Sequence, residues 1–343
     1  MRLVSRVLCL VLLMVCSVSF AMSLGEVSAP LADRSSASIK AAEQAALAQL
    51  LVQITGREDA TSLPGASDLL ANPQQWLSQY GYGRAADGSA TLEAHFDADG
   101  LSRALLAAGA PVWSLSRPPV LLWVATPAGV LGTNDGSALS AQADRRGLPL
   151  KLPANGAEVA ASDVRGRFMQ PVFAASQVYG TDLVATAVIY QGSPVQLRWW
   201  LYQKQTLLTQ GEGSAADQAA AQTLLVNQLT NAVASRYAVQ GGAAGSYQLD
   251  VTGVTSLATW HELNQYLLSL AGVSQVMTAR VAGAQAGWTL AFSGSADQLT
   301  RLLTVNPHLS ACGNAPTSDT TSAVTPASIE SAAPAVLAFC WQP

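Results

Sequence analysis

A short run in the first third of the chain combines side chains that often bind metals or move protons. The run is His95-Phe96-Asp97-Ala98-Asp99. Alternate residues of a strand point to the same side, so His95, Asp97 and Asp99 would share a face and offer ligands to a divalent metal. Such short clusters are common by chance. We therefore favour an interpretation in which His95 faces solvent and the two aspartates begin the next helix, and we predict no metal site.

The other residues suited to chemistry show no catalytic spacing. His261 precedes Glu262 on a helix that otherwise packs, and His308 follows Pro307 in a loop. A serine hydrolase needs an exposed nucleophile and a positioned base, and the chain has no Gly-x-Ser-x-Gly turn. The glycine-rich run at 132–136 lacks the lysine of a phosphate-binding loop. We therefore predict no catalytic residue and no cofactor.

Tryptophan is the remaining side chain with a recognition role to consider. Trp199 and Trp200 are adjacent on an expected strand, so they would project to opposite faces. One is expected in the core, and the other could lie at the surface and contact a sugar or a partner. Packing under a loop is the preferred interpretation of that second ring. Trp113 and Trp123 belong to apolar runs and are expected in the core.

The first 21 residues have the pattern of a cleaved secretory signal. Arg2 and Arg6 precede an apolar run at 7–18, and small residues stand where a signal peptidase reads. The run is shorter than the roughly 20 apolar residues of a spanning helix, which disfavours a retained anchor. Cleavage is expected between Ala21 and Met22, which predicts a periplasmic protein. A lipoprotein acylated at Cys16 is a third possibility, disfavoured because the bulky Val15 replaces the small residue of a lipobox.

Two cysteines remain after signal removal, Cys312 and Cys340. An even pair in an oxidising compartment predicts a disulfide. A metal site would need further ligands, and only His308 is close in sequence. The bridge would close a loop of about 28 residues, worth on the order of 3–4 kcal/mol in the chain-entropy model.

Composition limits the classes of partner. The chain has 343 residues, of which 50% are hydrophobic and only 12% charged, against a usual charged fraction of about 25%. The net charge is −4 and the isoelectric point about 5.3. No basic block occurs, so nucleic acid and anionic membrane surfaces are poor partners. No segment after the signal is long and apolar enough to be predicted as transmembrane.

The pattern of apolar residues predicts an α+β, mixed α/β protein of three small domains. An N-terminal β-α-β-β-α domain spans 22–113, a middle mixed domain spans 114–240, and a Gly/Ala-rich linker occupies 241–246. In the middle domain, the continuous apolar run at 120–125 predicts a strand buried on both faces. One helix is expected over 164–179, with Pro171 as an awkward interior residue.

The last domain, 247–343, has the order β-α-β-β-α-β, which is ferredoxin-like. Its first helix, over 256–270, is expected to turn Leu257, Trp260, Leu263, Leu267 and Leu268 inward. In that topology the last strand, 335–341, returns to pair beside the first. The segment 314–334 is rich in Ser, Thr, Ala and Pro and is expected to be a disordered insertion. The predicted disulfide would hold the last strand across it.

Several segments resemble one exported proteobacterial family, described as domain of unknown function 2066. They include APLADRSSASIKAAEQAALAQLLVQITG, FDADGLSRALLAAGAPVW, RPPVLLWVA, RRGLPLKLP and ASQVYGTDLVATAVIY followed by RWWLYQ. The resemblance covers nearly all of the mature chain and implies no activity. The middle domain is also loosely similar to small envelope modules such as the N-terminal domain of the Tol–Pal translocation protein, an analogy of fold alone.

Export, several small mixed units and the lack of catalytic spacing favour a non-enzymatic envelope protein. We expect an interaction or assembly module in the periplasm, with an envelope protein or peptidoglycan as partner. The alternative is a periplasmic small-molecule-binding protein that uses a cleft between the first two domains. A hydrolase of unfamiliar arrangement is the less favoured third hypothesis.

Overall fold

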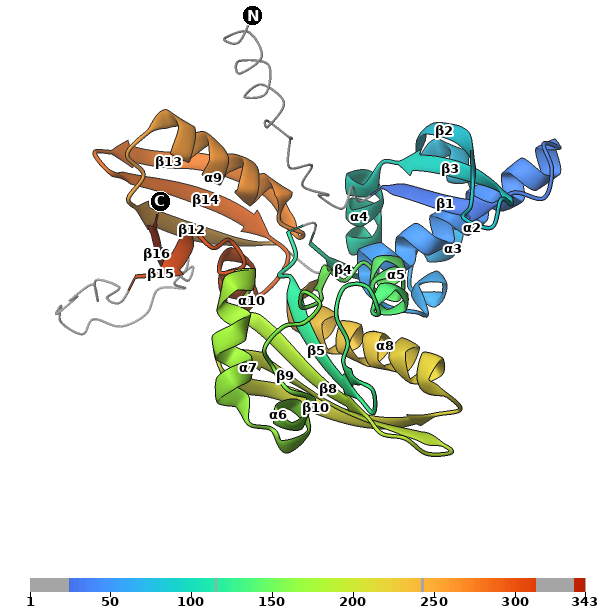
Figure 1. Ribbon diagram of the computed structural model, residues 1–343. Helices are drawn as coiled ribbons and strands as arrows, with labels where there is room; N and C mark the ends of the chain where they lie inside the picture. The colour runs from blue at the N-terminus through green and yellow to red at the C-terminus, as the bar shows by residue number, and fades with distance from the viewer. Residues whose placement is uncertain (1–24, 115, 242–243, 313–335, 343) are drawn as a thin grey trace, which may run out of the picture.

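A computed structural model describes residues 25–114, 116–241, 244–312 and 336–342 of the chain. The predicted signal, with its cleavage site between Ala21 and Met22, lies outside these residues, and so do Cys16 and the expected insertion 314–334. Within them the chain forms helices and several small sheets of mixed strand order (Figure 1). The predicted α+β class with several small units is therefore confirmed.

The N-terminal unit is a three-stranded antiparallel sheet of order β1-β3-β2, with one face covered by the long helix α2. Ser35 begins this helix by accepting a hydrogen bond from the Ser38 amide, and Gly56 ends it in the left-handed region at φ 68°. The elements are β1 (Glu26–Pro30), α2 (Ser36–Thr55), the 3-10 turn η1 (Ala60–Ser62), α3 (Ala66–Ala71), the 3-10 turn η2 (Pro73–Gln75), β2 (Leu77–Arg84), β3 (Ala90–Phe96) and α4 (Ala98–Ala107).

The middle unit is built on the sheet β10-β9-β8-β5-β6, in which β5 and β8 run parallel and β8, β9 and β10 run antiparallel. Every residue of β5 and β8 is buried, as predicted for β5 from its unbroken apolar run. The elements are β5 (Val120–Thr126), β6 (Gly129–Val130), α5 (Ser137–Arg146), β7 (Leu150–Lys151), α6 (Ala161–Gly166), α7 (Met169–Ser176), the 3-10 turn η3 (Gln177–Tyr179), β8 (Leu183–Ile189), β9 (Val195–Gln203), β10 (Thr206–Ala215) and α8 (Gln218–Tyr237).

Two expected details of the middle unit were wrong. The single helix expected over 164–179 is two helices, because Arg167 adopts the left-handed region at φ 57° and ends α6. Pro171 thereby falls in the first turn of α7, where a missing N–H costs no hydrogen bond. Trp199 and Trp200 project to opposite faces as predicted, and both are buried, which agrees with the preferred packed position of the second ring. The element that covers Trp200 differs from the expectation, because α6 and α7 pack over it where a loop was expected.

A short strand pair that the sequence pattern did not predict joins the three units. β4 (Pro111–Trp113) pairs antiparallel with β11 (Ala238–Gln240), so the end of the N-terminal unit meets the end of the middle one. Val112 packs in the N-terminal core, Trp113 in the middle core and Val239 in the C-terminal core. The domain limits drawn at 113/114 and 240/241 stay a prediction.

The C-terminal unit has the sheet order β13-β14-β12-β16-β15, so the last strand does pair beside the first. The pairing differs from a ferredoxin-like sheet in direction, because β16 runs parallel to β12. A strand missed by the prediction, β15, follows the second helix and pairs antiparallel with β16. β16 thus lies between the first strand and β15. The elements are β12 (Gly245–Thr252), α9 (Leu257–Ser269), β13 (Val273–Ala282), β14 (Gln285–Phe292), α10 (Ala296–Leu303), β15 (Leu309–Ala311) and β16 (Val336–Trp341).

The disulfide between Cys312 and Cys340 is present, with the two Cα atoms 5.4 Å apart. It ties β16 to the residue just after β15, and the Thr252 hydroxyl lies 3.2 Å from the Cys340 sulfur. The expectation for α9 was partly wrong. Leu263 and Leu267 are buried, but Leu257 and Leu268 are 79% and 51% exposed, because only one flank of the helix meets the sheet and α10.

Candidate functional site

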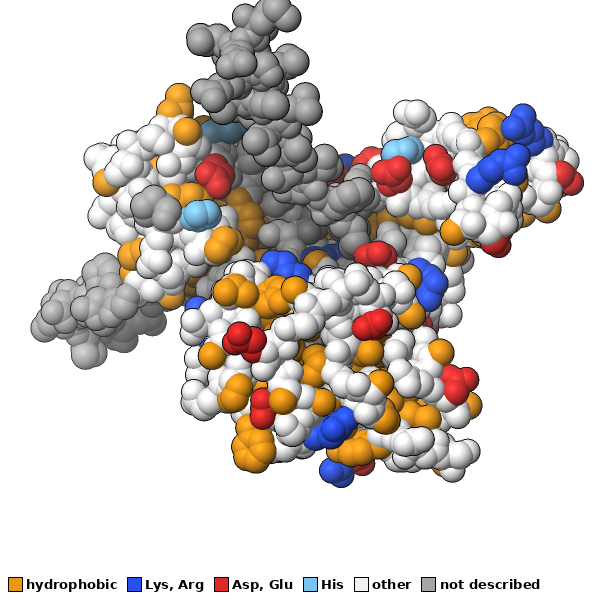
Figure 2. All heavy atoms as spheres, viewed as in Figure 1, with side chains coloured by type: hydrophobic (Ala, Val, Ile, Leu, Met, Phe, Trp, Pro, Cys, Tyr) orange, Lys and Arg blue, Asp and Glu red, His pale blue; other side chains and the backbone are white. Residues whose placement is uncertain are grey.

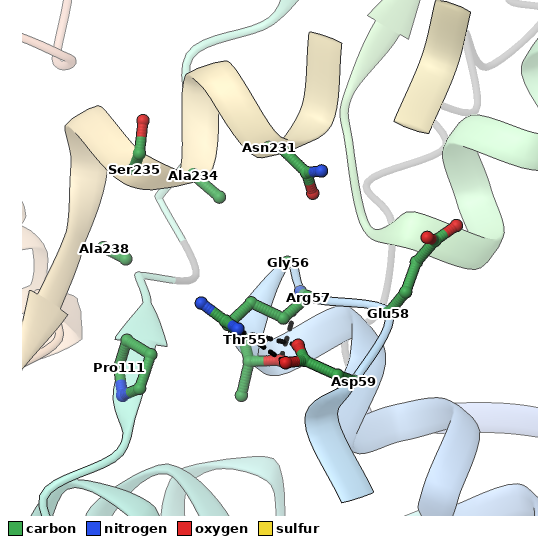
Figure 3. A pocket seen from close by; sticks show the side chains of 10 residues that line it. All are labelled: Thr55, Gly56, Arg57, Glu58, Asp59, Pro111, Asn231, Ala234, Ser235 and Ala238. Atoms are coloured by element: carbon green, nitrogen blue, oxygen red, sulfur yellow. Dashed lines mark hydrogen bonds and ion pairs between the residues drawn. The ribbon is translucent and has the colours of Figure 1, made fainter. Parts of the chain in front are cut away.

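The interface between the N-terminal and middle units encloses a cavity of about 470 Å³ (Figure 3). That volume lies in the range of small-molecule sites, about 300–1,000 Å³. One wall comes from the end of α2 and the loop after it, and the other from the last turns of α8 with β4 and β11. The lining residues are Thr55, Gly56, Arg57, Glu58, Asp59, Pro111, Asn231, Ala234, Ser235 and Ala238.

The loop after α2 places a charged pair at the cavity. Gly56 leaves the helix in the left-handed region, and the next residues turn back so that Arg57 forms a fork with Asp59, at 2.8 Å from Nε and 2.6 Å from Nη2. The hydrogen bond from Arg57 lowers the pKa of Asp59, and the same bond raises the pKa of Arg57. Both side chains are about half exposed, so the pair contributes little to stability. The Arg57 Nη1 group remains a donor beside the cavity.

A buried arginine, Arg146, lies in the same interface behind the lining of the cavity. The Arg146 side chain is 3% exposed and lies 2.9 Å from Glu58 Oε1. Its guanidinium donates to the carbonyl oxygen of Gly56 and to Asn231 Oδ1, both at 2.7 Å. Burial lowers the pKa of Arg146, and the charge of Glu58 opposes that shift. Arg146 therefore bridges α5, α8 and the loop after α2, and it leaves the amide nitrogen of Asn231 as a donor toward the cavity.

Glutamines extend the same interface along α2. Gln49 donates to the carbonyl oxygen of Arg145 at 2.6 Å, and Gln53 donates to that of Asp144 at 3.0 Å. Both acceptors lie in the last turn of α5, whose carbonyls have no partner within the helix. The two helices are thus held by side chain to backbone bonds, which fix the position of one cavity wall against the other.

The cavity combines an apolar floor with a few polar groups. Pro111, Ala234 and Ala238 supply the apolar surface, and the Ser235 hydroxyl adds an acceptor. The donors of Arg57 and Asn231 would suit a carboxylate or a carbonyl oxygen of a small molecule. No group of three or more His, Cys, Asp or Glu side chains capable of holding a metal occurs in the described ranges.

A second arginine marks the junction of all three units. Arg117 is 7% exposed and lies over the Trp113 ring at 4.5 Å. Its Nε donates to the Ser114 carbonyl at 2.8 Å, and its Nη groups donate to the carbonyls of Gly147 and Trp113. Burial lowers the pKa of Arg117 to about 9, so the guanidinium is charged at neutral pH. Ser114 continues the junction, because Ala271 of the C-terminal unit donates to its hydroxyl at 3.3 Å.

A larger groove, of about 960 Å³, separates the middle and C-terminal units. Lys204 and Asp182, 3.5 Å apart, line the middle side. Glu262, Tyr266 and His308 line the C-terminal side. Burial raises the pKa of Tyr266, and its hydroxyl donates to the Leu302 carbonyl at 2.6 Å, which ties α9 to α10. The Tyr266 hydroxyl therefore has a packing role.

The C-terminal sheet also presents a face that carries few charges. Its helix side holds the core, and its other side carries half-buried or exposed residues, apart from the buried Gly287. The only ion pair on that side among the described residues joins Arg280 to Asp250 at 3.4 Å, across Gly287. Figure 2 shows the C-terminal unit at the upper left, with few charged side chains on the side turned to the viewer. We call the side of the sheet turned away from the helices the open face; it comprises Gln248, Asp250, Thr252, Gln275, Met277, Arg280, Gly287, Thr289, Ala291, Val336, Ala338 and Cys340.

The structure separates the residues of the His95 run. Asp97 caps α4 by accepting from the Gly100 amide at 2.9 Å, and Asp99 lies in its first turn, as the favoured interpretation predicted. His95 lies 3.7 Å from Glu26 on the neighbouring strand.

The other two histidines lie in the C-terminal unit. His261 is exposed on α9. His308 stacks on Trp341 with ring centres 5.0 Å apart, and its Nδ1 lies 2.7 Å from the Gln342 carbonyl oxygen.

The arginines at the two interfaces were missed by the sequence analysis. Arg117 and Arg146 stand in the segments RPPVLLWVA and RRGLPLKLP, whose resemblance to a family assigns no role to either residue, and Arg57 lies outside the quoted segments. Arg146 ends a predicted helix, where a basic residue is ordinarily read as a surface partner of the helix dipole. The only usable signal was the scarcity of charged residues, which makes each one more informative.

No helix in the part of the chain that the structure describes is both long and apolar enough to cross a bilayer.

Residues 21–114 match a family described as a domain of unknown function (DUF8605). This match covers the N-terminal unit and supports an uncharacterised family there. The particular resemblance to domain of unknown function 2066 stays a prediction.

No curated protein matches the chain. Among solved structures, the chain is similar to the LpoB C-terminal domain from Salmonella enterica, with 14% identity, a TM-score of 0.21, and coverage of 29% of this chain and 83% of that one. It is also similar to a Competence-Damaged Protein (CinA) superfamily protein from Klebsiella pneumoniae, with 16% identity, a TM-score of 0.22, and coverage of 40% and 92%. Neither similarity is close enough to support an argument about function.

Proposed function

We propose that this protein is a non-enzymatic interaction module of the periplasmic cell envelope, whose partner is an envelope protein or peptidoglycan. The observation that carries the proposal is the open face of the C-terminal sheet. Depletion of charge is the compositional mark of interface centres, whereas overall hydrophobicity is not. Thr289 and Ala291 lie at the middle of this face, and Met277 and Val336, at its sides, are 49% and 55% exposed.

The construction of the rest of the chain is consistent with this role. Arg146 and Arg117 fix the units to one another through buried hydrogen bonds to backbone carbonyls. The C-terminal unit is held by two further bonds, from the Ala271 amide to the Ser114 hydroxyl and from Arg301 Nε to the Arg236 carbonyl, both at 3.3 Å. Contacts of this kind hold the open face in one orientation, which lowers the ordering cost when a partner binds. The export signal expected at the N-terminus would deliver the protein to the periplasm.

A photo-crosslinking experiment in cells tests the proposal. A photoreactive residue at Thr289 should give an adduct of one defined mass, identifiable by mass spectrometry, and Thr289→Lys should abolish the interaction in a competing copy. The matched control is a photoreactive residue at the exposed Thr209 of β10, which should give no such adduct. Purified mature protein should also be tested for sedimentation with isolated peptidoglycan. Absence of both a Thr289-specific adduct and peptidoglycan binding would contradict the proposal.

The cavity between the N-terminal and middle units favours a second candidate, the binding of a small molecule. The Arg57 and Asn231 donors and the apolar floor would suit a ligand with one carboxylate or carbonyl group. A panel of small carboxylic acids should raise the melting temperature of the wild-type protein. Ser235→Tyr, at an exposed lining position, should fill the cavity and remove that shift, while the same change at exposed Ser274 should retain it. A panel without any shift would argue against this candidate.

A further inference from the structure

β13 forms one edge of the C-terminal sheet and is ten residues long. Among the described residues it pairs with β14 alone. Its sequence, VSQVMTARVA, contains three valines and neither glycine nor proline. Its one charged residue, Arg280, is already held by Asp250. An edge of this length without a free charge is a template for another strand, because its outer N–H and C=O groups have no partner in the sheet.

The flank of α9 beside this edge carries two exposed leucines. Tyr266 binds the Leu302 carbonyl and so turns one flank of α9 toward α10. Leu257 and Leu268 lie on the opposite flank, eleven residues apart, which is about three helical turns. They are 79% and 51% exposed. α9 packs on β13, so this flank, which is turned away from α10, is the one available beside the β13 edge.

The pairing with β14 determines which side each β13 residue faces. Val276, opposite Leu290, and Thr278, opposite Trp288, lie on the helix side, because their partners belong to the core. Val273 and Val281 lie opposite Phe292 and Ala286 and share that side. Met277, opposite Thr289, lies on the open face. Irregularities after Val273 and after Thr278 produce this pattern.

We propose that β13 pairs antiparallel with β13 of a second copy of this chain, about a two-fold axis at Met277. In this register Val276 lies opposite Thr278 of the second copy, and Val273 lies opposite its Val281. In both pairs the two side chains lie on the helix side of the sheet, because directly opposed residues of an antiparallel pair point to the same face. Met277 meets Met277 of the second copy on the open face. Arg280 lies opposite Ser274, so no like charges oppose each other.

A second copy fits this surface better than an isolated peptide. A two-fold axis would bring the α9 helices of both copies to the same side of one continuous sheet. The flanks with Leu257 and Leu268 would then face each other and add apolar contact to the strand pairing. Strand pairing alone buries little of the roughly 1,000 Å² or more that a stable interface needs, so the helices supply the remainder. The open face would become twice as wide, which extends the proposed function without depending on it.

Sedimentation velocity of the purified mature protein over a concentration series tests the proposal. We expect a monomer–dimer equilibrium for the wild type. Met277→Lys places two ammonium groups together at the axis, so the dissociation constant should rise at least about tenfold. Leu207→Lys on the other long edge strand, β10, is the matched control and should leave the equilibrium unchanged. Circular dichroism should show that both variants remain folded.

A cysteine experiment supplies an independent measurement of register. Met277→Cys should form an intermolecular disulfide under mild oxidation, because residue 277 meets itself at the axis, whereas Leu207→Cys should not. A wild-type protein that stays monomeric throughout the concentration series would overturn the proposal. A dimer that Met277→Lys leaves intact, or that crosslinks equally through residue 207, would also overturn it. Binding of a different protein to a monomer through β13 would likewise count against the second copy as occupant.

Discussion

The strands of the middle and C-terminal sheets differ in how much of their surface the rest of the chain covers. β5 and β8 of the middle sheet are buried at every residue, since helices cover both faces. In β13 of the C-terminal sheet eight of the ten residues are exposed, since helices cover one face and, among the described residues, no strand pairs with its outer edge. The edge strand of the middle sheet, β10, has the same length as β13, but it carries Gly211, Gly213 and Glu212, and Gln228 of α8 donates to its backbone. The middle sheet is therefore buried on both faces, whereas the C-terminal sheet leaves one face and one edge strand exposed.

The largest loss of unfolding free energy should come from truncating a buried side chain of the middle sheet. Trp123 is fully buried in β5, and its Nε1 donates to the Ser176 hydroxyl at 3.0 Å. We expect Trp123→Ala to lower the free energy of unfolding by about 3–5 kcal/mol in urea titrations. Met277→Ala on the open face should change it by no more than about 0.5 kcal/mol. Similar costs at both positions would remove the distinction between the two sheets.

Loss of the disulfide should affect the C-terminal sheet alone. Cys312 and Cys340 are 28 residues apart, and opening that loop should cost about 3–4 kcal/mol in the chain-entropy model. Hydrogen exchange of the double variant Cys312→Ser with Cys340→Ser should accelerate in β15 and β16, while β5 and β8 keep their protection. Equal loss of protection in both sheets would show that the two unfold as one cooperative unit.

Removing the arginine at the junction tests how far the two sheets depend on one another. Arg117→Met leaves the carbonyls of Trp113, Ser114 and Gly147 without these donors, and we expect a loss of about 2–3 kcal/mol. Burial lowers the pKa of Arg117 in the folded protein to about 9, below its unfolded value. Through Arg117, folding therefore releases protons only at alkaline pH, and the contribution of Arg117 makes stability rise with pH only above about 9.

The difference in unfolding free energy between the wild type and Arg117→Met should accordingly be nearly constant between pH 6 and 8, because even pH 8 lies about one unit below the folded pKa of about 9. Arg117→Lys is the matched control: it keeps the charge but lacks the planar fork, so it should recover part of the loss. A difference that varied strongly within this range would point to a titrating partner of Arg117.

The smallest effects should come from charges placed on the two edges. Met277→Lys and Leu207→Lys both alter exposed side chains, at 49% and 41% exposure. Each should change the unfolding free energy of the monomer by no more than about 0.5 kcal/mol in urea titrations at low protein concentration. A large loss for either variant would mean that its edge is packed against something in the folded chain.

Helices and strands with a strong periodic pattern could be predicted from the sequence. The residues that line the candidate binding cavity could not. The α2 prediction succeeded because Ser35 and Gly56 cap a run with a regular apolar spacing, and local chemistry determines both ends. The disulfide prediction succeeded because only two cysteines, Cys312 and Cys340, follow the predicted signal. The cavity was expected between the first two units, but its lining came from residues as distant as Arg57 and Asn231, which no local pattern connects.

The sequence by itself determined the mixed class, most element positions, the burial of β5 on both faces and the covalent link between Cys312 and Cys340. Those features depend on residue type, periodicity and the number of cysteines. Only the tertiary structure decided that β16 inserts parallel beside β12, that β4 pairs with β11, and that Leu257 faces outward although its spacing suits a core. All three observations depend on which surface a segment distant in sequence covers. The free energy gained by burying a side chain depends on that covering segment, and a local sequence pattern does not contain it.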